Sequence, residues 1–299
     1  MASVFTRLRI ELKNTFTGTG AEPPRWTEEL AEGDDTGYFA PGSAVWSVHS
    51  SMTPTVGGIR ALLLQALHPG AMAGVYHHSN FREDPLGRLA NTIRWIFTVT
   101  YGSTDAARSA SAWVLRLHEK VTGVYEDAAG VEHVYQANEP HLLRWVHLAF
   151  TDGFLAAHQS YGLRFPGGAD QYVAQWARAG ELMGVTDPPR SARELRDQLA
   201  EYDGELTDSA QVQDALAYIR NPPLPRSQRL GYRILFVGAV ATLTQRQRDL
   251  LGISVPHVGP LKLPVKPAVM LVLGFIKLGL GRRGPTEMAA LRRHDRLRG

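Results

Sequence analysis

The sequence predicts an all-α, single-domain bundle of many helices behind an irregular N-terminal lead. Three observations support this prediction. From about residue 56 onward, apolar residues recur at spacings of three and four, which is typical of amphipathic and buried helices. Gly and Pro pairs separate these segments without a linker-like stretch or an internal repeat. Apolar residues make up 44% of the 299-residue chain, enough to build one large core.

The N-terminal lead is assigned to residues 1–55, which are rich in turn-forming residues and lack a sustained apolar period. The helical domain is then expected to cover residues 56–299. Its first helix is expected at about 59–77, where apolar residues occur nearly all round. Pro69 should kink or end this helix, because proline removes a backbone donor.

Strong signals define the next helix. Asp84 is a candidate N-cap with Pro85 at the first helical position, and Gly102 follows the last periodic residue. Asn138 is likewise expected to cap a long helix. Later helices are expected at about 104–122, 138–161, 170–183, 192–203, 208–219, 227–244 and 268–280, with a short hairpin between 123 and 138.

The charges are nearly balanced, with 32 Lys and Arg against 29 Asp and Glu, so nucleic acid is not an expected partner. The excess of cations lies at the C-terminus, from Arg282 onward. We expect this segment to be a solvated basic tail, with peripheral membrane contact as the alternative. The apolar segment 268–280 is shorter than the roughly 18 residues that a membrane-spanning helix needs, and burial is favoured over an interfacial position. Without a recognisable export signal, the expected location is the cytoplasm.

The chain contains no cysteine, which excludes disulfides, iron–sulfur clusters, thiolate-ligated haem and cysteine nucleophiles. The sequence also lacks a GxSxG elbow, a P-loop, a GxGxxG turn and an HExxH helix. None of the 11 histidines has a glutamate three residues before it, so a ferritin-like di-iron bundle is a poor interpretation. Any chemistry must therefore use histidine, carboxylate, hydroxyl or a bound cofactor.

Several histidines lie on apolar helix faces. His118 follows Val114 and Leu115 by one turn, so its imidazole should point into the core. His147 lies in a similarly apolar stretch, and His68 precedes a proline in an almost wholly apolar helix. For each one alone, a core histidine that hydrogen-bonds to the backbone and a metal or haem ligand both remain open.

Arg88 and Thr92 lie one turn apart on a partly apolar helix face. A buried arginine needs an anion, which an internal acid or a bound ligand could supply. Together with inward histidines in a cysteine-free bundle, the pair suits a haem pocket, where imidazole binds iron and cations bind the propionates.

Three blocks of the sequence support a more specific hypothesis. The blocks LLLQALHPGAMAGVYHHSNFREDPLGRLANTIRWIFTVTYG, LHEKVTGVY and YQANEPHLLRWVHLAFTDGFLAAH resemble the oxygenase family of MpaB-like proteins and latex clearing proteins. The resemblance implies an all-α fold, one non-covalently bound haem b and dioxygen as co-substrate. It implies that Arg88 and Thr92 lie on the oxygen-binding side and that His118 ligates the iron. His147 is the alternative ligand, and His68 is a further candidate for contact with the cofactor.

Two departures from the latex clearing pattern bear on the substrate. Asn91 stands where those proteins have a lysine before the threonine, and Glu83 is no clear equivalent of their upstream glutamate. Both departures argue against cleavage of polyisoprene. The resulting expectation is a haem b-dependent oxygenase-like oxidoreductase acting on a hydrophobic, unsaturated, lipid- or terpenoid-like small molecule. The alternative is a non-catalytic haem-binding or lipid-binding helical protein.

Overall fold

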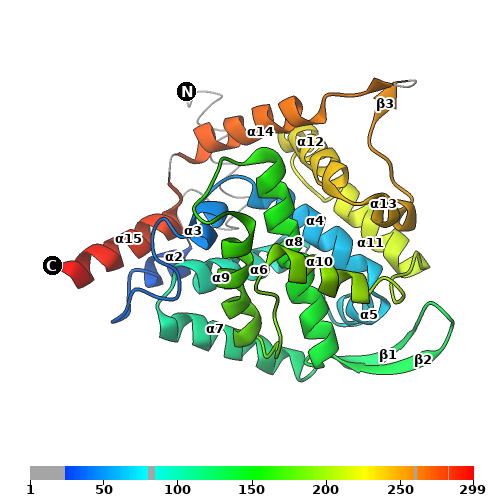
Figure 1. Ribbon diagram of the computed structural model, residues 1–299, viewed down its shortest axis with the longest axis horizontal. Coiled ribbons are helices and arrows are strands. Elements are labelled where there is room, and N and C mark those ends of the chain that lie inside the picture. The colour runs from blue at the N-terminus through cyan, green and yellow to red at the C-terminus, as the bar shows by residue number, and fades with distance from the viewer. Residues whose placement is uncertain (1–23, 80–84, 259–260, 282) are drawn as a thin grey trace.

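The computed structural model describes residues 24–79, 85–258, 261–281 and 283–299 (Figure 1). Within these ranges the fold is all-α with two small antiparallel hairpins, which confirms the predicted fold class. The helices are α2 (Arg25–Glu29), α3 (Ala44–His49), α4 (Pro54–Leu67), α5 (Pro69–His78), α6 (Pro85–Tyr101), α7 (Thr104–His118), α8 (Pro140–Tyr161), α9 (Gly168–Leu182), α10 (Ala192–Glu201), α11 (Ala210–Arg220), α12 (Arg226–Thr242), α13 (Gln245–Leu251), α14 (Val265–Leu280) and α15 (Pro285–Arg298). The strands are β1 (Thr122–Glu126), β2 (Glu132–Gln136), β3 (His257–Val258) and β4 (Leu261–Lys262).

Helices α4 and α8 cross at the centre of the core (Figure 1). They approach closely because glycines face each other at the crossing. A Cβ at Gly153 would lie 2.6 Å from the carbonyl oxygen of Gly57, and a Cβ at Gly57 would lie 2.9 Å from that of Gly153. Any larger residue at either position would force the helices apart.

The predicted break at Pro69 is confirmed, and it makes two helices of the expected first one. His68 adopts an extended backbone conformation and caps α5. Its Nδ1 accepts hydrogen bonds from the backbone N–H groups of Gly70 at 3.2 Å and Ala71 at 3.4 Å. The side chain that sequence reasoning considered a cofactor contact therefore satisfies a helix N-terminus.

The predicted hairpin is confirmed as β1 and β2, but the predicted cap at Asn138 is wrong. Glu139 occupies the N-cap position of α8, and Pro140 begins the helix. The Asn138 side chain instead donates from Nδ2 to the carbonyl oxygen of Leu115, at 2.9 Å. This contact joins the start of α8 to the last turn of α7. The other predicted cap, Asp84, lies outside the described residues, as does Glu83.

The N-terminal lead is more ordered than the sequence suggested. Helices α2 and α3 form within it, and Ser43 caps α3 by accepting a hydrogen bond from the Trp46 N–H at 3.2 Å. Val45 and Val48 are buried in the main core. These helices are too short to show a clear apolar period, so turn-forming residues around them dominate the sequence signal.

The basic C-terminus is a docked helix rather than a solvated tail. Arg293 in α15 is buried, and it donates to the carbonyl oxygens of Asp35 at 3.0 Å and Tyr101 at 2.7 Å, with a further hydrogen bond to that of Leu30. Arg292 pairs with Glu28. Much of the C-terminal positive charge therefore holds α15 against α2 and the loop that follows it.

Helix α14 begins at Val265 and ends at Leu280, close to the predicted segment. Only one of its faces is buried; the other exposes large apolar side chains. The expectation of burial is thus correct for half of the helix. In the described part of the chain, no helix is long and apolar enough to cross a bilayer.

Candidate functional site

Helices α6 and α7 form an antiparallel hairpin joined by the short link Gly102–Ser103. The Trp95 indole Nε1 in α6 donates to the Ser111 hydroxyl in α7, at 3.1 Å. Arg88 lies seven residues before Trp95, and His118 lies seven residues after Ser111. Because each helical residue rises about 1.5 Å, the two residues reach the same level of the hairpin. The fold thus brings the predicted cation and the predicted iron ligand to one end of a helix pair.

Arg88 is half-buried in the first turn of α6. Burial lowers the pKa of its guanidinium. Within residues 24–79, 85–258, 261–281 and 283–299, no carboxylate pairs with this guanidinium and no acceptor receives a hydrogen bond from it. A partly buried cation without a counter-ion attracts an anion more strongly than one in bulk water, so this position is suited to receive an anionic group.

Thr92 is half-buried one turn further along α6. Its Oγ1 donates to the backbone carbonyl oxygen of Arg88 at 3.3 Å, a long contact for a hydroxyl donor. The hydroxyl can therefore turn toward a ligand at little cost.

His118 ends α7 and is half-buried. Its Nδ1 is buried and has no hydrogen-bond partner among the described residues. Burial lowers the pKa of His118, and the adjacent Asn138 side chain acts in the opposite direction. The imidazole is therefore neutral near pH 7, which is the form that binds a metal ion.

Asn138 is the neighbour that sequence reasoning missed. Its Nδ2 holds the last turn of α7 through Leu115, while its Oδ1 is buried and has no partner in the described part of the chain. Nδ1 of His118, a potential donor, and Oδ1 of Asn138, an acceptor, are thus both unpaired at the same end of α7. The sequence signal was present but misleading, since asparagine before Glu139-Pro140 resembles a helix cap.

His147, the alternative ligand, lies between α8 and α9. A Cβ on Gly180 of α9 would come within 3.0 Å of three atoms of its imidazole, so this ring packs directly on a helix backbone. Its Nε2 is buried without a partner among the described residues, and burial lowers the pKa of His147 to about 4. The structure does not join His147 to the α6–α7 hairpin through any described hydrogen bond or ion pair.

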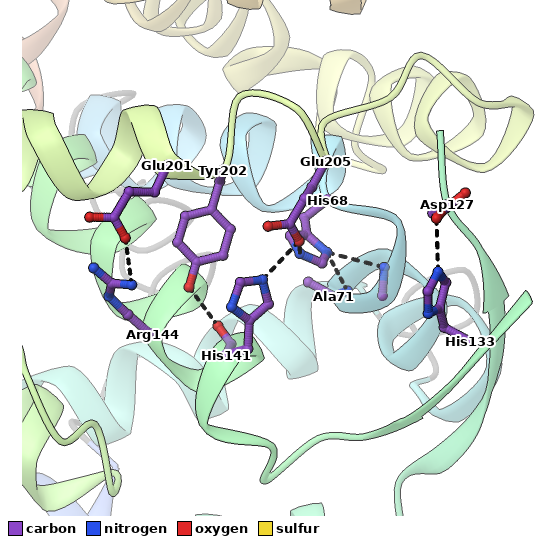
Figure 2. Close-up of polar contacts among 10 residues, drawn as sticks. His68, Ala71, Asp127, His133, His141, Arg144, Glu201, Tyr202 and Glu205 are labelled. Atoms are coloured by element: carbon purple, nitrogen blue, oxygen red, sulfur yellow. Dashed lines mark hydrogen bonds and ion pairs between the residues drawn. The ribbon is translucent and has the colours of Figure 1, made fainter. Parts of the chain in front are cut away.

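His68 belongs to a separate cluster with His141 and Glu205 (Figure 2). Figure 2 shows the Glu205 carboxylate between the two imidazoles, with its Oε2 at 3.2 Å from His68 Nε2 and 2.8 Å from His141 Nε2. The three side chains are close enough to suggest a metal site.

The tautomer of His68 argues against a metal ion in this cluster. Burial lowers the pKa of His68 to about 4, so the ring is neutral at pH 7. Because its Nδ1 accepts from two backbone N–H groups, its proton lies on Nε2 and is donated to Glu205. A metal ion at Nε2 would displace that proton and disrupt the cap of α5. The cluster instead anchors the segment after α10 to the α4–α5 junction.

The comparison with protein families identifies the domain. The family described as ER-bound oxygenase mpaB/B'/Rubber oxygenase, catalytic domain, matches residues 46–264. The chain belongs to this family. Searches of curated proteins and of solved structures return no match. The matched range contains every site residue discussed above, and it supports an oxygenase-like function for this mpaB/rubber-oxygenase domain.

Proposed function

We propose that this chain is a haem b-dependent, oxygenase-like oxidoreductase that uses dioxygen and acts on a hydrophobic, unsaturated small molecule. The proposal is carried by one observation. The half-buried guanidinium of Arg88 and the neutral imidazole of His118 lie at the same level of the α6–α7 hairpin. Among the described residues, the guanidinium has no ion-pair partner and His118 Nδ1 has no hydrogen-bond partner. Haem b offers a counterpart for each, because its iron binds imidazole and its propionates bind cations.

The residues fit this cofactor. His118 is the metal ligand in the proposal, since its lowered pKa keeps the ring neutral. The absence of cysteine restricts the chain to non-covalent haem without a thiolate ligand. When bound, haem b supplies an iron centre at which dioxygen can be activated.

Asn138 is the positioning residue for His118 in this proposal. The Nδ1–H group of His118 would donate to Oδ1 of Asn138, and Nε2 would then hold the iron. A hydrogen bond of this kind fixes the orientation of the ring and raises its basicity as a ligand. It also satisfies two polar atoms that are otherwise buried without partners.

Arg88 and Thr92 act on anionic oxygen groups. The Arg88 guanidinium binds a propionate or stabilises an oxyanion that develops during the reaction, because a cation held in a partly dry site interacts more strongly than one in water. The Thr92 hydroxyl donates a hydrogen bond to the same region after turning from the Arg88 carbonyl.

The surroundings of the pair suit an apolar substrate. Leu89 and Ile93 of α6 and Val114 of α7 are half-buried, and Trp113 and Leu117 of α7 are exposed. Apolar walls with few polar groups are typical of sites for small hydrophobic ligands. The exposed Asn91 provides no cation next to Thr92, which supports a substrate other than polyisoprene.

The proposal is tested by ultraviolet–visible spectra of the oxidised and reduced protein, with haem quantified as its pyridine complex. We expect near one haem per chain, and we expect His118→Ala to lose the wild-type spectrum and to regain ligation when free imidazole is added. His147→Ala is the matched variant and should retain the spectrum. If His118→Ala keeps the wild-type spectrum while His147→Ala loses it, the ligand assignment is wrong.

Two further outcomes address the alternatives. A protein that stays colourless after reconstitution with haem would overturn the haem proposal and favour a helical lipid-binding protein. A haem-loaded protein that consumes no oxygen with unsaturated fatty acids or terpenoids would contradict the oxygenase-like activity and favour haem binding without turnover.

A further inference from the structure

Helix α14 has two apolar faces. Val269, Leu273 and Ile276 are buried against the rest of the protein, and α14 packs beside α12. The opposite face is exposed and repeats at helical spacing, so it forms a continuous stripe. The residues of this exposed face are Pro267, Met270, Leu271, Gly274, Phe275 and Leu278.

The exposure of this face is large for apolar side chains. Leu271 is 77% exposed and Leu278 is 73% exposed. Figure 1 shows α14 along the upper edge of the molecule, away from the β1–β2 hairpin at the opposite edge. A contiguous apolar stripe on a surface helix marks an interaction site, whereas single exposed leucines do not.

The charged residues of α14 and of the segments that flank it in the sequence are all positive. From Leu250 to Thr286 the sequence contains no aspartate or glutamate. Lys266 and Lys277 are exposed near the two ends of the stripe and have no ion-pair partner among the described residues. Arg282 and Arg283 follow the helix in the sequence. An apolar stripe with cations at its ends complements a surface that has an apolar interior beneath a layer of anionic groups.

We propose that the exposed face of α14 docks on an anionic lipid bilayer. Leu271 and Leu278 enter the boundary between headgroups and acyl chains, and Lys266 and Lys277 contact lipid phosphates. Helices of this kind lie in the plane of the interface and do not span it. The contact is made through α14 rather than through the basic C-terminal helix, whose Arg292 and Arg293 are already bound within the protein.

Charge favours a bilayer over a second copy of the chain. A two-fold symmetric dimer through this stripe would bring the same patch of each copy together. Lys266 and Lys277 would then face equivalent lysines with no acid from Leu250 to Thr286 to compensate them. Like charges at an interface oppose association.

The test measures partitioning of the full chain onto sucrose-loaded vesicles of phosphatidylcholine alone or with phosphatidylglycerol. We expect binding to the anionic vesicles, weakened by added salt because the charges are exposed. The double substitution Leu271→Glu/Leu278→Glu should lower the partition coefficient on the order of 100-fold, since it replaces apolar contacts with repelled charges. Lys266→Gln/Lys277→Gln should lower it by roughly 30-fold, because each lysine near an anionic surface contributes to binding.

The matched control is Val134→Glu on β2. Val134 is 80% exposed but lies on the hairpin opposite α14, so this substitution should leave binding unchanged. Circular dichroism confirms that each variant is folded. Haem content is measured in parallel and should not change in any of them, so failure of vesicle binding is distinguishable from failure of the proposed function.

Two outcomes would overturn the proposal. One is wild-type protein that stays in the supernatant with anionic vesicles, or that loses no binding on Leu271→Glu/Leu278→Glu. The other is a wild-type dimer that fails to bind vesicles and becomes monomeric on the same substitution, which would assign the stripe to a second copy of the chain.

Discussion

The α4–α8 crossing buries an arginine and the α6–α7 hairpin half-buries one, but they treat its charge differently. Arg60 in α4 donates from Nε and Nη2 to Asp152 Oδ2 in α8, at 2.8 and 2.5 Å, and from Nη1 to Thr242 at 3.3 Å. Arg88 in α6 has no such partner in the described part of the chain. The first arrangement belongs to the folded core, and the second is the position that we propose for a ligand.

This contrast separates structural from functional polar groups. A buried charge with a structural role is paired within the fold, because an unpaired buried charge lowers the free energy of unfolding. A charge that must bind a cofactor or substrate is held in place by the helix but left without its anion. Buried unpaired atoms also occur elsewhere, such as Trp145 Nε1, but only the α6–α7 hairpin combines an unpaired imidazole nitrogen with the Arg88 cation at one helix end among the residues discussed.

The largest expected effect breaks the paired region. Asp152→Ala leaves Arg60 buried without its carboxylate and should lower the free energy of unfolding by about 3–5 kcal/mol, measured by urea denaturation. Asp197→Ala is the control, because its pair with Arg193 at 3.6 Å is exposed and should contribute less than about 1 kcal/mol. Equal losses in the two variants would contradict the structural role of the Arg60 pair.

The next effect concerns the proposed support of the iron ligand. Asn138→Leu removes the acceptor for His118 Nδ1, so haem affinity should fall by about 10- to 100-fold, measured by haem transfer to a scavenger protein. Asn138→Asp keeps an acceptor oxygen for Nδ1 but loses the Nδ2 donor to Leu115, so the affinity should fall less than in Asn138→Leu. Gln136→Leu, at an exposed position nearby, should have no effect. A loss of affinity in Gln136→Leu of the same size would indicate a general effect on the hairpin.

An intermediate effect is expected from acid. Burial lowers the pKa of His49 to about 3 and that of His147 to about 4, below the 6.5 of an ordinary histidine. At pH values between about 4 and 6.5, these histidines are protonated in the unfolded chain but not in the folded chain. The free energy of unfolding should therefore fall as the pH is lowered from about 6.5 toward 4, by up to about 1.4 kcal/mol per pH unit for each histidine.

His147→Met sharpens this prediction. It keeps the volume similar and removes one of the histidines whose pKa is lowered, so the slope of unfolding free energy against pH should decrease while haem content stays unchanged. An unchanged slope would show that protonation of His147 does not contribute to acid unfolding.

The smallest effect on stability should come from the unpaired region. Arg88→Met removes a half-buried cation that has no anion among the described residues, so the free energy of unfolding of the haem-free protein should change by no more than about 1 kcal/mol. Haem content should nevertheless fall. A loss comparable with that of Asp152→Ala would mean that Arg88 is a structural residue, and the contrast between the two regions would fail.

Much of the fold could be predicted from local signals. Pro69 and the hairpin residues determine chain direction through their own backbone preferences, and α6 ends just before Gly102 as predicted. Short helices were harder to predict: α3 has six residues and forms because Val45 and Val48 are buried by distant helices. The Asn138 cap failed because Glu139 supplies the N-cap backbone while the Asn138 side chain finds a carbonyl on α7.

The candidate site could be predicted in part. The one-turn spacing of Arg88 and Thr92 and the resemblance to an oxygenase family selected these two residues and His118, and the register of α6 against α7 brings them to one end of the hairpin. The roles of these residues and of His147 stay predictions. His68 illustrates the limit, because its apolar helix gave no sign that Glu205 would bind its Nε2.

The sequence by itself determined the residue types, the helix breaks and the face on which each polar side chain lies, because these depend on neighbours within a few residues. Only the tertiary structure decided which polar groups are paired. The partner of Arg60 lies 92 residues away and that of His68 lies 137 residues away, so neither pairing is visible in local periodicity. The same holds for α14, whose two apolar faces are equivalent in the sequence until packing buries one and leaves the other exposed.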